Sequence, residues 1–441
     1  MQPIAEYYFP TTVWHGCAQS PYLRSNEAAV NEKVFESVAD SDSSFGTIIG
    51  GAQLVEGSDS LLHTMQSSSA SRGLKVLHLL SRLQIGGMER AAIRLAKRGV
   101  REGMEHVLLL FDKPFQSREF DFDPGCLPTE FVPRGPGLDM SFARKLAKRI
   151  AHGIDIVHAY NDSAIFYAAL AIAIGRQKQT GLIGTFCTRP SHVTVGARIS
   201  TRWATGRADR IVAVSDELAS WLVSTGWAKD CSTICRGVDL TEFFPDTADR
   251  SWREKLNVPE NAILVGHVAR FAPIKRHQDV LYAASQLRGA HPQVIFALAG
   301  EGPLFRSIQD QARELNNVIF LSNVGDIPSF LRSVDILILC SEHEGTPQAL
   351  LEGMACGRAI IATTVGGVPH LLGAKDVPVG ILIPPNHPHL LAEHISNLSR
   401  DPAKRSDLGK LAEERSKLFS FEQEWEKYRQ LYAAVAQHTT Q

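Results

Sequence analysis

This chain of 441 residues has few cysteines, only short apolar runs and a net charge close to zero. The 7 cysteines are scattered and odd in number, so a disulfide framework is excluded and reduced thiols are expected. The longest apolar stretch, Ala164–Gly175, is too short to cross a bilayer and predicts a buried helix. The 46 basic and 47 acidic side chains nearly cancel, and we expect no nucleic-acid partner.

The composition is that of a soluble globular enzyme, with 44% apolar and 21% charged residues. Nothing in Met1–Pro10 resembles a signal peptide, because a basic flank and a long apolar core are both missing, so we expect a cytoplasmic protein. Residues 73–245 carry 23 Lys and Arg against 17 Asp and Glu. This part is therefore the one expected to meet an anionic surface, such as the inner face of the plasma membrane.

Residues 1–72 are rich in serine and hold only short apolar islands. Too little apolar surface is available there to offset chain entropy, so we expect a disordered extension. From Leu74 onward, short apolar runs alternate with helical patterns. This alternation predicts parallel sheets that are covered by helices on both faces.

The most informative stretch is Ser341–Gly357, which follows the buried-strand pattern Val334–Cys340. A turn with Gly345 leads into a helical pattern, so Glu344 lies in the turn and Glu352 about one and a half turns into the helix. Both carboxylates can then face one ligand over the carboxyl end of the strand. Free N–H groups at the helix start favour an anion, and together these features outline a nucleotide-sugar site.

The spacing of Glu344 and Glu352, the turn at Gly345 and the later pair Gly366–Gly367 resemble the donor site of retaining glycosyltransferases of family 4. This family has the GT-B fold, in which two doubly wound, Rossmann-like α/β domains face each other across a cleft. The resemblance covers about residues 74–436. The parts it implies are an acceptor-side domain (73–245), a donor domain (246–417), a helix that returns to the first domain (418–436) and a tail (437–441).

The resemblance also implies roles for individual residues. Arg270 and Lys275 match a pair that clamps the diphosphate in the family, where fixed cations stabilise the charge of the leaving group without reorganising. Glu344 is expected to hold the sugar and Glu352 the ribose hydroxyls. The expected catalytic residues are Glu344, Arg270, Lys275 and His158, and the expected donor-binding residues are Gly87, Gly300, Gly302, Gly345, Thr346, Leu350 and Glu352.

Several of these residues have a purely structural alternative. His158 matches a family histidine that touches the sugar, and we expect it at the strand end facing the cleft, although a strand-end histidine is more often structural. Gly300 and Gly302 form a strand-to-helix turn that is expected to border the nucleoside, and Glu89 is expected only to complement the dipole of its helix. Arg236 and His370 depart from the family pattern, which usually has Asn and Glu at these positions.

The function we expect is transfer of a sugar, with retention, from a nucleoside-diphosphate sugar to a hydroxyl of a glycan or lipid-linked acceptor. Stretches Pro136–Asp139 and Val214–Leu222 resemble polysaccharide-assembly transferases and favour bacterial exopolysaccharide or lipid-linked glycan assembly. A nucleotide-sugar epimerase on the same fold is the alternative, and would yield an epimer from the donor alone. A catalytically silent scaffold is a third possibility, which the intact Arg270, Lys275, Glu344 and Glu352 argue against.

No metal or other cofactor is expected. Asp121 and Asp123 have the D-x-D form of metal-dependent transferases, but they stand in a proline-rich loop and we interpret them as a coincidence. The helical pattern Ser141–His152 carries four basic residues beside apolar ones, namely Arg144, Lys145, Lys148 and Arg149. A solvated helix face is the commoner meaning of such a pattern, and peripheral attachment to an anionic membrane is the alternative.

Overall fold

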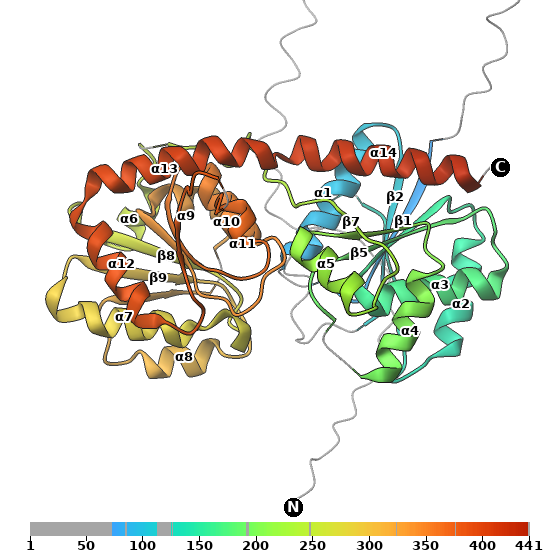
Figure 1. Cartoon of the computed structure of the whole chain (residues 1–441), viewed down its shortest axis with the longest axis horizontal. Helices are drawn as coiled ribbons and strands as arrows, with labels where there is room; N and C mark the ends of the chain where they lie inside the picture. The colour runs from blue at the N-terminus through green and yellow to red at the C-terminus, as the bar shows by residue number, and fades with distance from the viewer. Residues whose placement is uncertain are drawn as a thin grey trace, which may run out of the picture. The chain divides into compact units, whose positions relative to one another are not determined.

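A computed structural model describes residues 73–83, 86–112, 125, 127–190, 194–246, 248–322, 324–374 and 376–439, all within one compact unit, Ser71–Gln441. The predicted disordered extension 1–72 and the pair Asp121 and Asp123 lie outside the described residues. The described elements form two α/β layers, each of which consists of one parallel-stranded sheet and the helices that cover it (Figure 1). The two doubly wound, Rossmann-like domains predicted from the sequence are therefore confirmed.

The first sheet has seven parallel strands in the order β3-β2-β1-β4-β5-β6-β7. These strands are β1 (Lys75–Leu80), β2 (Glu105–Leu110), β3 (Thr129–Phe131), β4 (Ile156–Tyr160), β5 (Gly181–Phe186), β6 (Arg210–Ala213) and β7 (Ser232–Thr233). The helices between them are α1 (Gly87–Arg101), α2 (Met140–Ile150), α3 (Asn161–Gly175), α4 (Val195–Thr205) and α5 (Asp216–Ser224). Strands β1, β4 and β5 are almost completely buried because helices cover both faces, as is usual in parallel sheets.

The second sheet has six parallel strands in the order β10-β9-β8-β11-β12-β13. These strands are β8 (Ile263–Val268), β9 (Val294–Ala299), β10 (Val318–Leu321), β11 (Ile336–Leu339), β12 (Ala359–Thr363) and β13 (Ile381–Ile383). Its helices are α6 (Ser251–Lys255), α7 (His277–Ala290), α8 (Phe305–Gln311), α9 (Ile327–Ser333), α10 (Gln348–Ala355), α11 (Val368–Leu371), α12 (Pro388–Arg400) and α13 (Pro402–Ser416). A 3-10 turn, Pro273–Lys275, follows β8, and another, Lys417–Phe419, follows α13.

The chain passes between the two sheets twice, and the two passages lie side by side. Val238 and Ser420 form a parallel bridge, in which the Val238 N–H donates to the Phe419 carbonyl and the Phe421 N–H donates to the Val238 carbonyl, both at 2.8 Å. A Cβ on Gly237 would lie only 2.5 Å from the Ser420 carbonyl oxygen, so the close approach requires glycine there. The linker after β7 and the segment after α13 are thus joined by backbone hydrogen bonds.

The last helix, α14 (Phe421–Thr439), packs on the first sheet although it follows the second in sequence (Figure 1). Its buried aromatic residues lie in one apolar cluster with Val76, Ile156, Ile183 and Val212 of the strands. Trp425, one of these aromatic residues, also donates from Nε1 to Glu102 at 2.7 Å. Helix α14 therefore completes the core of the first α/β layer.

Candidate functional site

The β11–α10 unit carries the two acidic residues that the sequence singled out. β11 is fully buried, and the turn after it leads to Pro347, from which α10 begins. Glu344 lies in this turn and Glu352 in the second turn of α10. Both carboxylates therefore follow the carboxyl end of the central strand β11, and ligands bind at this end of the strands in open parallel sheets.

Glu344 is held by two hydrogen-bond donors. The Ser341 hydroxyl donates to its Oε1 at 2.6 Å, and Lys275 Nζ forms an ion pair with the same oxygen at 2.5 Å. Lys275 ends the 3-10 turn after β8, and the neighbouring Ile274 carbonyl accepts from the Glu342 N–H at 2.9 Å. The two loops are thus fastened together, which fixes an ammonium group against a carboxylate at the edge shared by β8 and β11.

Arg270 stands in the same loop as Lys275 but is exposed and has no hydrogen-bond or ion-pair partner among the residues that the structure describes. The backbone beside it packs tightly on the turn after β9. A Cβ on Gly300 would lie 2.1 Å from the Ala269 carbonyl oxygen, and one on Gly302 would lie 2.5 Å from that of Phe271. These two glycines therefore position the Arg270 loop by close packing, and the guanidinium group is left facing solvent.

Glu352 is 6% exposed, and burial raises the pKa of its carboxyl group from 4.5 to about 7. The positive charges of Arg90 and Arg94 on α1 act in the opposite direction, and the negative charge of Glu242 adds to the rise. A buried carboxyl group without a fixed cation against it is costly when ionised. Groups of this kind cluster at ligand sites, where a substrate supplies the missing partners.

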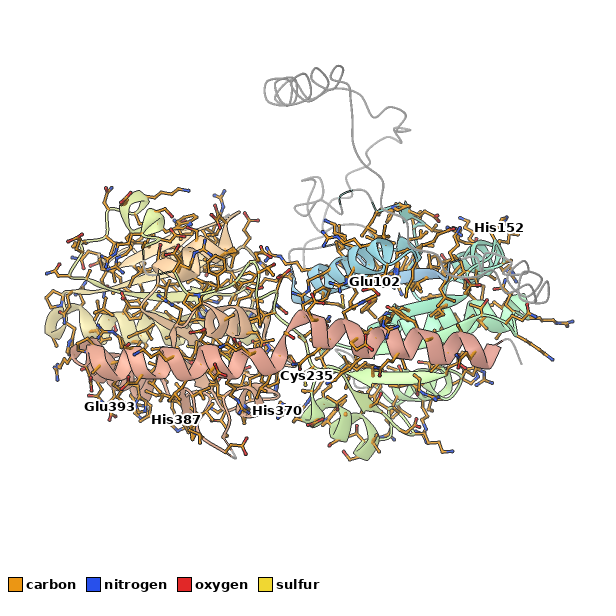
Figure 2. The ribbon with its side chains drawn as sticks, turned by 90° about the horizontal axis from the view of Figure 1, so that it is seen from above. Glu102, His152, Cys235, His370, His387 and Glu393 are labelled. Atoms are coloured by element: carbon orange, nitrogen blue, oxygen red, sulfur yellow. The ribbon has the colours of Figure 1, made fainter. Side chains whose placement is uncertain are left out.

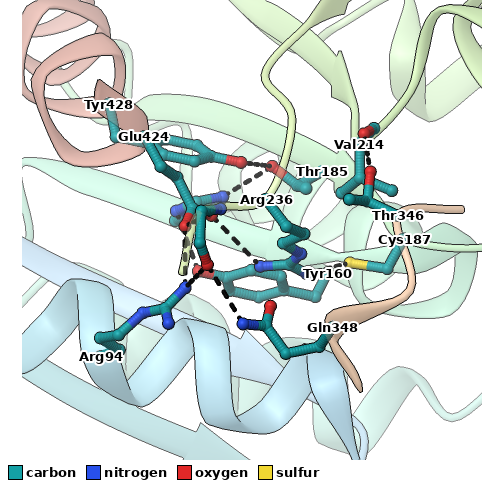
Figure 3. Close-up of polar contacts among 12 residues, drawn as sticks. Arg94, Tyr160, Thr185, Cys187, Val214, Arg236, Thr346, Gln348, Glu424 and Tyr428 are labelled. Carbon is teal, nitrogen blue, oxygen red and sulfur yellow. Dashed lines mark hydrogen bonds and ion pairs between the residues drawn. The ribbon is translucent and has the colours of Figure 1, made fainter. Parts of the chain in front are cut away.

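Contacts join the loops of the second layer to the first layer (Figure 3). The Thr346 hydroxyl donates to the Val214 carbonyl, and Gln348 Nε2 donates to the Gly237 carbonyl at 3.1 Å. A Cβ on Gly345 would lie 2.5 Å from the Cys187 carbonyl oxygen, so this turn also needs glycine to approach the first layer. The structure thus gives Gly345 and Thr346 a packing role between the layers.

Gly87 begins α1, and a Cβ there would be 3.6 Å from the Cβ of Gln348. The expected glycine turn therefore does reach the start of α10. Because 3.6 Å is an ordinary contact distance, packing alone does not demand glycine at this position. Glu89, in the first turn of α1, is buried, and burial raises its pKa to about 7 while a hydrogen bond from its own backbone lowers it. That hydrogen bond agrees with the expected role at the helix start.

The expected position of His158 is wrong. His158 lies in the middle of β4 and not at its end, and its side chain is fully buried. Both imidazole nitrogens are used, because Nδ1 is 2.8 Å from the Tyr432 hydroxyl and Nε2 is 2.8 Å from the Thr185 hydroxyl. Burial lowers the pKa of His158 to about 3, so the ring is neutral. The side chain of Leu350 is 1% exposed and lies in the apolar core of the second layer, and its expected part in donor binding stays a prediction.

The buried polar network around Arg236 was not predicted from the sequence (Figure 3). Arg236 Nη2 donates to Cys187 Sγ at 2.8 Å, and its Nη1 is 3.6 Å from Glu424 Oε1. The other oxygen of Glu424 accepts from Arg94 Nη2 at 3.0 Å and from the Gly237 N–H at 2.9 Å. The departure at position 236 from the family pattern was the one available signal.

Helix α2 combines a buried apolar face with exposed basic residues. Its apolar residues, among them Phe142, Leu146 and Ile150, pack into the core of the first layer. Arg149 is held by Glu130 through hydrogen bonds of 2.7 to 2.9 Å, whereas Arg144, Lys145 and Lys148 are exposed. The apolar face is thus not available to a membrane, and only the three free cations are.

The described residues contain neither a membrane-spanning helix nor a metal-binding cluster. No helix there combines the length and the apolar character needed to cross a membrane. No group of three or more His, Cys, Asp or Glu side chains in those ranges could hold a metal ion.

Comparisons with known proteins agree with this architecture. A model of glycosyl transferases group 1 matches residues 248–415, and a model of glycosyltransferase family 4 matches residues 85–242. The chain is 26% identical over 316 residues to the Bacillus subtilis glycosyltransferase EpsF, covering 64% of this chain and 77% of that protein. It is 27% identical over 235 residues to a D-inositol 3-phosphate glycosyltransferase of Streptomyces bingchenggensis, about half of each protein (49% and 51%).

A solved structure of Anabaena HepE in complex with UDP-glucose superposes with a TM-score of 0.69 at 23% identity, covering 82% of this chain and all of that one. This likeness shows a shared fold. The matches give no support to the epimerase alternative. With one family model on each of its two sheets, the chain belongs to the GT-B glycosyltransferases of group 1 and family 4.

Proposed function

We propose that this enzyme transfers a sugar, with retention of configuration, from a nucleoside-diphosphate sugar to a hydroxyl group of a glycan or lipid-linked acceptor. The observation that carries the proposal is the ion pair of Lys275 with Glu344 beside the exposed guanidinium of Arg270. Carboxylates accept hydrogen bonds from the hydroxyl groups of a sugar, and cations bind the phosphate oxygens of a diphosphate. These groups lie together at the carboxyl edge of the second sheet.

In this proposal the two cations bind the diphosphate and stabilise the charge that grows on it as the glycosidic bond breaks. Lys275 is already fixed by Glu344, so little reorganisation is needed during the reaction. Arg270 adds a planar donor set that matches phosphate oxygens. Because Arg270 and Lys275 supply the positive charge, we propose that no metal ion is required, and turnover should persist in the presence of EDTA.

Glu344 would bind sugar hydroxyls near the anomeric carbon, since Ser341 and Lys275 fix one of its oxygens and leave the other for substrate. Glu352 would accept hydrogen bonds from the ribose hydroxyls, which replace the solvation that burial has removed. No side chain is assigned as a covalent nucleophile. We propose a front-face path in which the leaving phosphate takes the proton of the acceptor hydroxyl.

The relatives support the donor class by what their names state: Anabaena HepE was solved with UDP and with UDP-glucose. A role in bacterial exopolysaccharide or lipid-linked glycan assembly rests on the sequence resemblance of Pro136–Asp139 and Val214–Leu222. In the structure these stretches supply Asp139 and Ser215 as caps of α2 and α5.

The test is a screen of nucleoside-diphosphate sugars for thermal stabilisation, followed by incubation of each stabilising donor with and without glycan acceptors. A transferase gives product only with an acceptor, and at most slow hydrolysis without one. If no nucleotide sugar stabilises the wild-type protein, or if stabilisation is unchanged in Lys275→Ala, the proposed donor site is wrong.

A further inference from the structure

A cavity of about 340 Å³ lies at the point where the chain passes between the two sheets. Its lining includes Arg236 from the linker, His370 from α11, Arg415 from α13, and Glu424 and Lys427 from α14. Figure 2 shows His370 and another lining residue, Cys235, beside these long terminal helices. None of the residues assigned to the donor site lines it, so the cavity is a separate place on the molecule.

The floor of this cavity carries an excess of positive charge. Glu424 is the carboxylate there, and Arg94 already forms an ion pair with it at 3.0 Å. Arg236 approaches the same carboxylate only to 3.6 Å, and its Nη1 has no hydrogen-bond partner among the described residues. Its other contact is the thiol of Cys187, whose pKa is raised by burial, so the thiol stays neutral. One carboxylate therefore faces two guanidinium groups.

The walls add to this excess. Arg415 donates to the carbonyls of Leu371 and His370 at 2.6 and 2.7 Å, and the nearest carboxylate, Asp376, is 3.7 Å away and 69% exposed. Lys427 is exposed at the rim and has no ion-pair partner in the described part of the chain. The cavity is thus lined by three cations, Arg236, Arg415 and Lys427, and by two carboxylates, Glu424 and Asp376. A net positive charge in a hollow with low-dielectric walls concentrates anions there.

We propose that this cavity binds a small anion with a compact, multiply oxygenated charge, such as a phosphate or carboxylate group of a free metabolite. Its volume is in the range of small-ligand sites. Lys427 would contact the anion at the rim, and the positive charges of Arg236 and Arg415 would attract it from the floor and the wall of the cavity. Because the linker, α11, α13 and α14 all contribute walls, an anion in the cavity contacts segments that belong to both layers.

The experiment is equilibrium dialysis of radiolabelled inorganic phosphate against the full chain, with ionic strength held constant by chloride. Malate serves as the carboxylate probe in competition. The donor site also binds phosphate groups, so Lys275→Ala is measured beside the wild type to remove that contribution. We expect at least one phosphate to remain bound in Lys275→Ala and to be displaced by malate.

Lys427→Gln should weaken the remaining phosphate about fivefold, which corresponds to the loss of one unit charge at contact distance in a watery environment. Arg236→Gln should weaken phosphate binding as well. Arg236 is buried, so this variant could fail to fold, and the exposed Lys427→Gln then still decides the test. The matched control is Lys410→Gln, an exposed lysine on α13 that does not line the cavity. The proposal is overturned if Lys275→Ala binds no phosphate, or if Lys427→Gln and Lys410→Gln bind it as the wild type does.

Discussion

Replacing Glu352 with Gln should make the protein more stable and less able to bind its donor. Burial raises the pKa of Glu352 from 4.5 to about 7. Between these two pH values the Glu352 carboxyl group is protonated in the folded protein and ionised in the unfolded chain. The free energy of unfolding therefore falls as pH rises through this window. At 1.36 kcal/mol for each pKa unit, this rise in pKa lowers the free energy of unfolding by about 3 kcal/mol, and the loss is complete above about pH 7. Glutamine is neutral throughout and does not incur it.

The assay is thermal unfolding of wild type and Glu352→Gln at a series of pH values from 4.5 to 8. The melting temperature of the variant should exceed that of the wild type at pH 8, and the gap should close toward pH 4.5. Glu393→Gln is the matched control, because Glu393 is an exposed residue of α12 and its replacement should give no such pH-dependent gap. Donor affinity of Glu352→Gln should fall about tenfold, since a hydrogen bond to a charged group is lost. A gap that is constant over pH, or a variant less stable than wild type at pH 8, refutes the reasoning.

Three further predictions concern the donor clamp, the extension and the basic helix. Lys275→Ala should lower turnover by a factor that corresponds to roughly 2–4 kcal/mol, as when one transition-state donor is removed, and near-normal turnover in a folded variant would contradict the clamp. Deleting residues 1–72 should leave the melting temperature and donor binding unchanged, as expected for a segment predicted to be disordered, and a large loss of stability would show otherwise. The wild type should co-sediment with anionic vesicles at low salt, and replacing Arg144, Lys145 and Lys148 with Gln should abolish this, because each contributes about 1 kcal/mol near such a surface. Binding that is equal on neutral vesicles, or unaffected by the three replacements, would rule out the proposed attachment.

The parts of the site that could be predicted from the sequence are those whose chemistry is local. Glu344, Gly345 and Glu352 belong to one strand–turn–helix unit, so their spacing alone places them at one edge of the sheet. The alternation of short apolar runs with helical patterns predicted the two parallel sheets for the same reason. Short elements such as β3 and β7, with three and two residues, carry too little pattern to be predicted.

The error at His158 has a different cause. A strand covered on both faces shows no apolar–polar alternation, so its pattern marks neither where the strand ends nor which face a given side chain takes, and β4 in fact continues beyond His158 to Tyr160. The face of His158 is covered by α14, and its partner Tyr432 lies 274 positions further along the chain. The contact of Gly237 with Glu424 likewise spans 187 positions. Only the folded chain brings such residues together.

The position of α14 also bears on how the protein is made. The core of the first layer includes Tyr428, Tyr432 and Val435, which are translated only after the whole second layer. Amino-terminal domains commonly fold during synthesis, but here the first α/β layer waits with an open apolar face until the whole second layer has been translated. Helix α14 then completes the core of the first layer, so a nascent chain truncated before residue 421 leaves that apolar face exposed to chaperones and to aggregation.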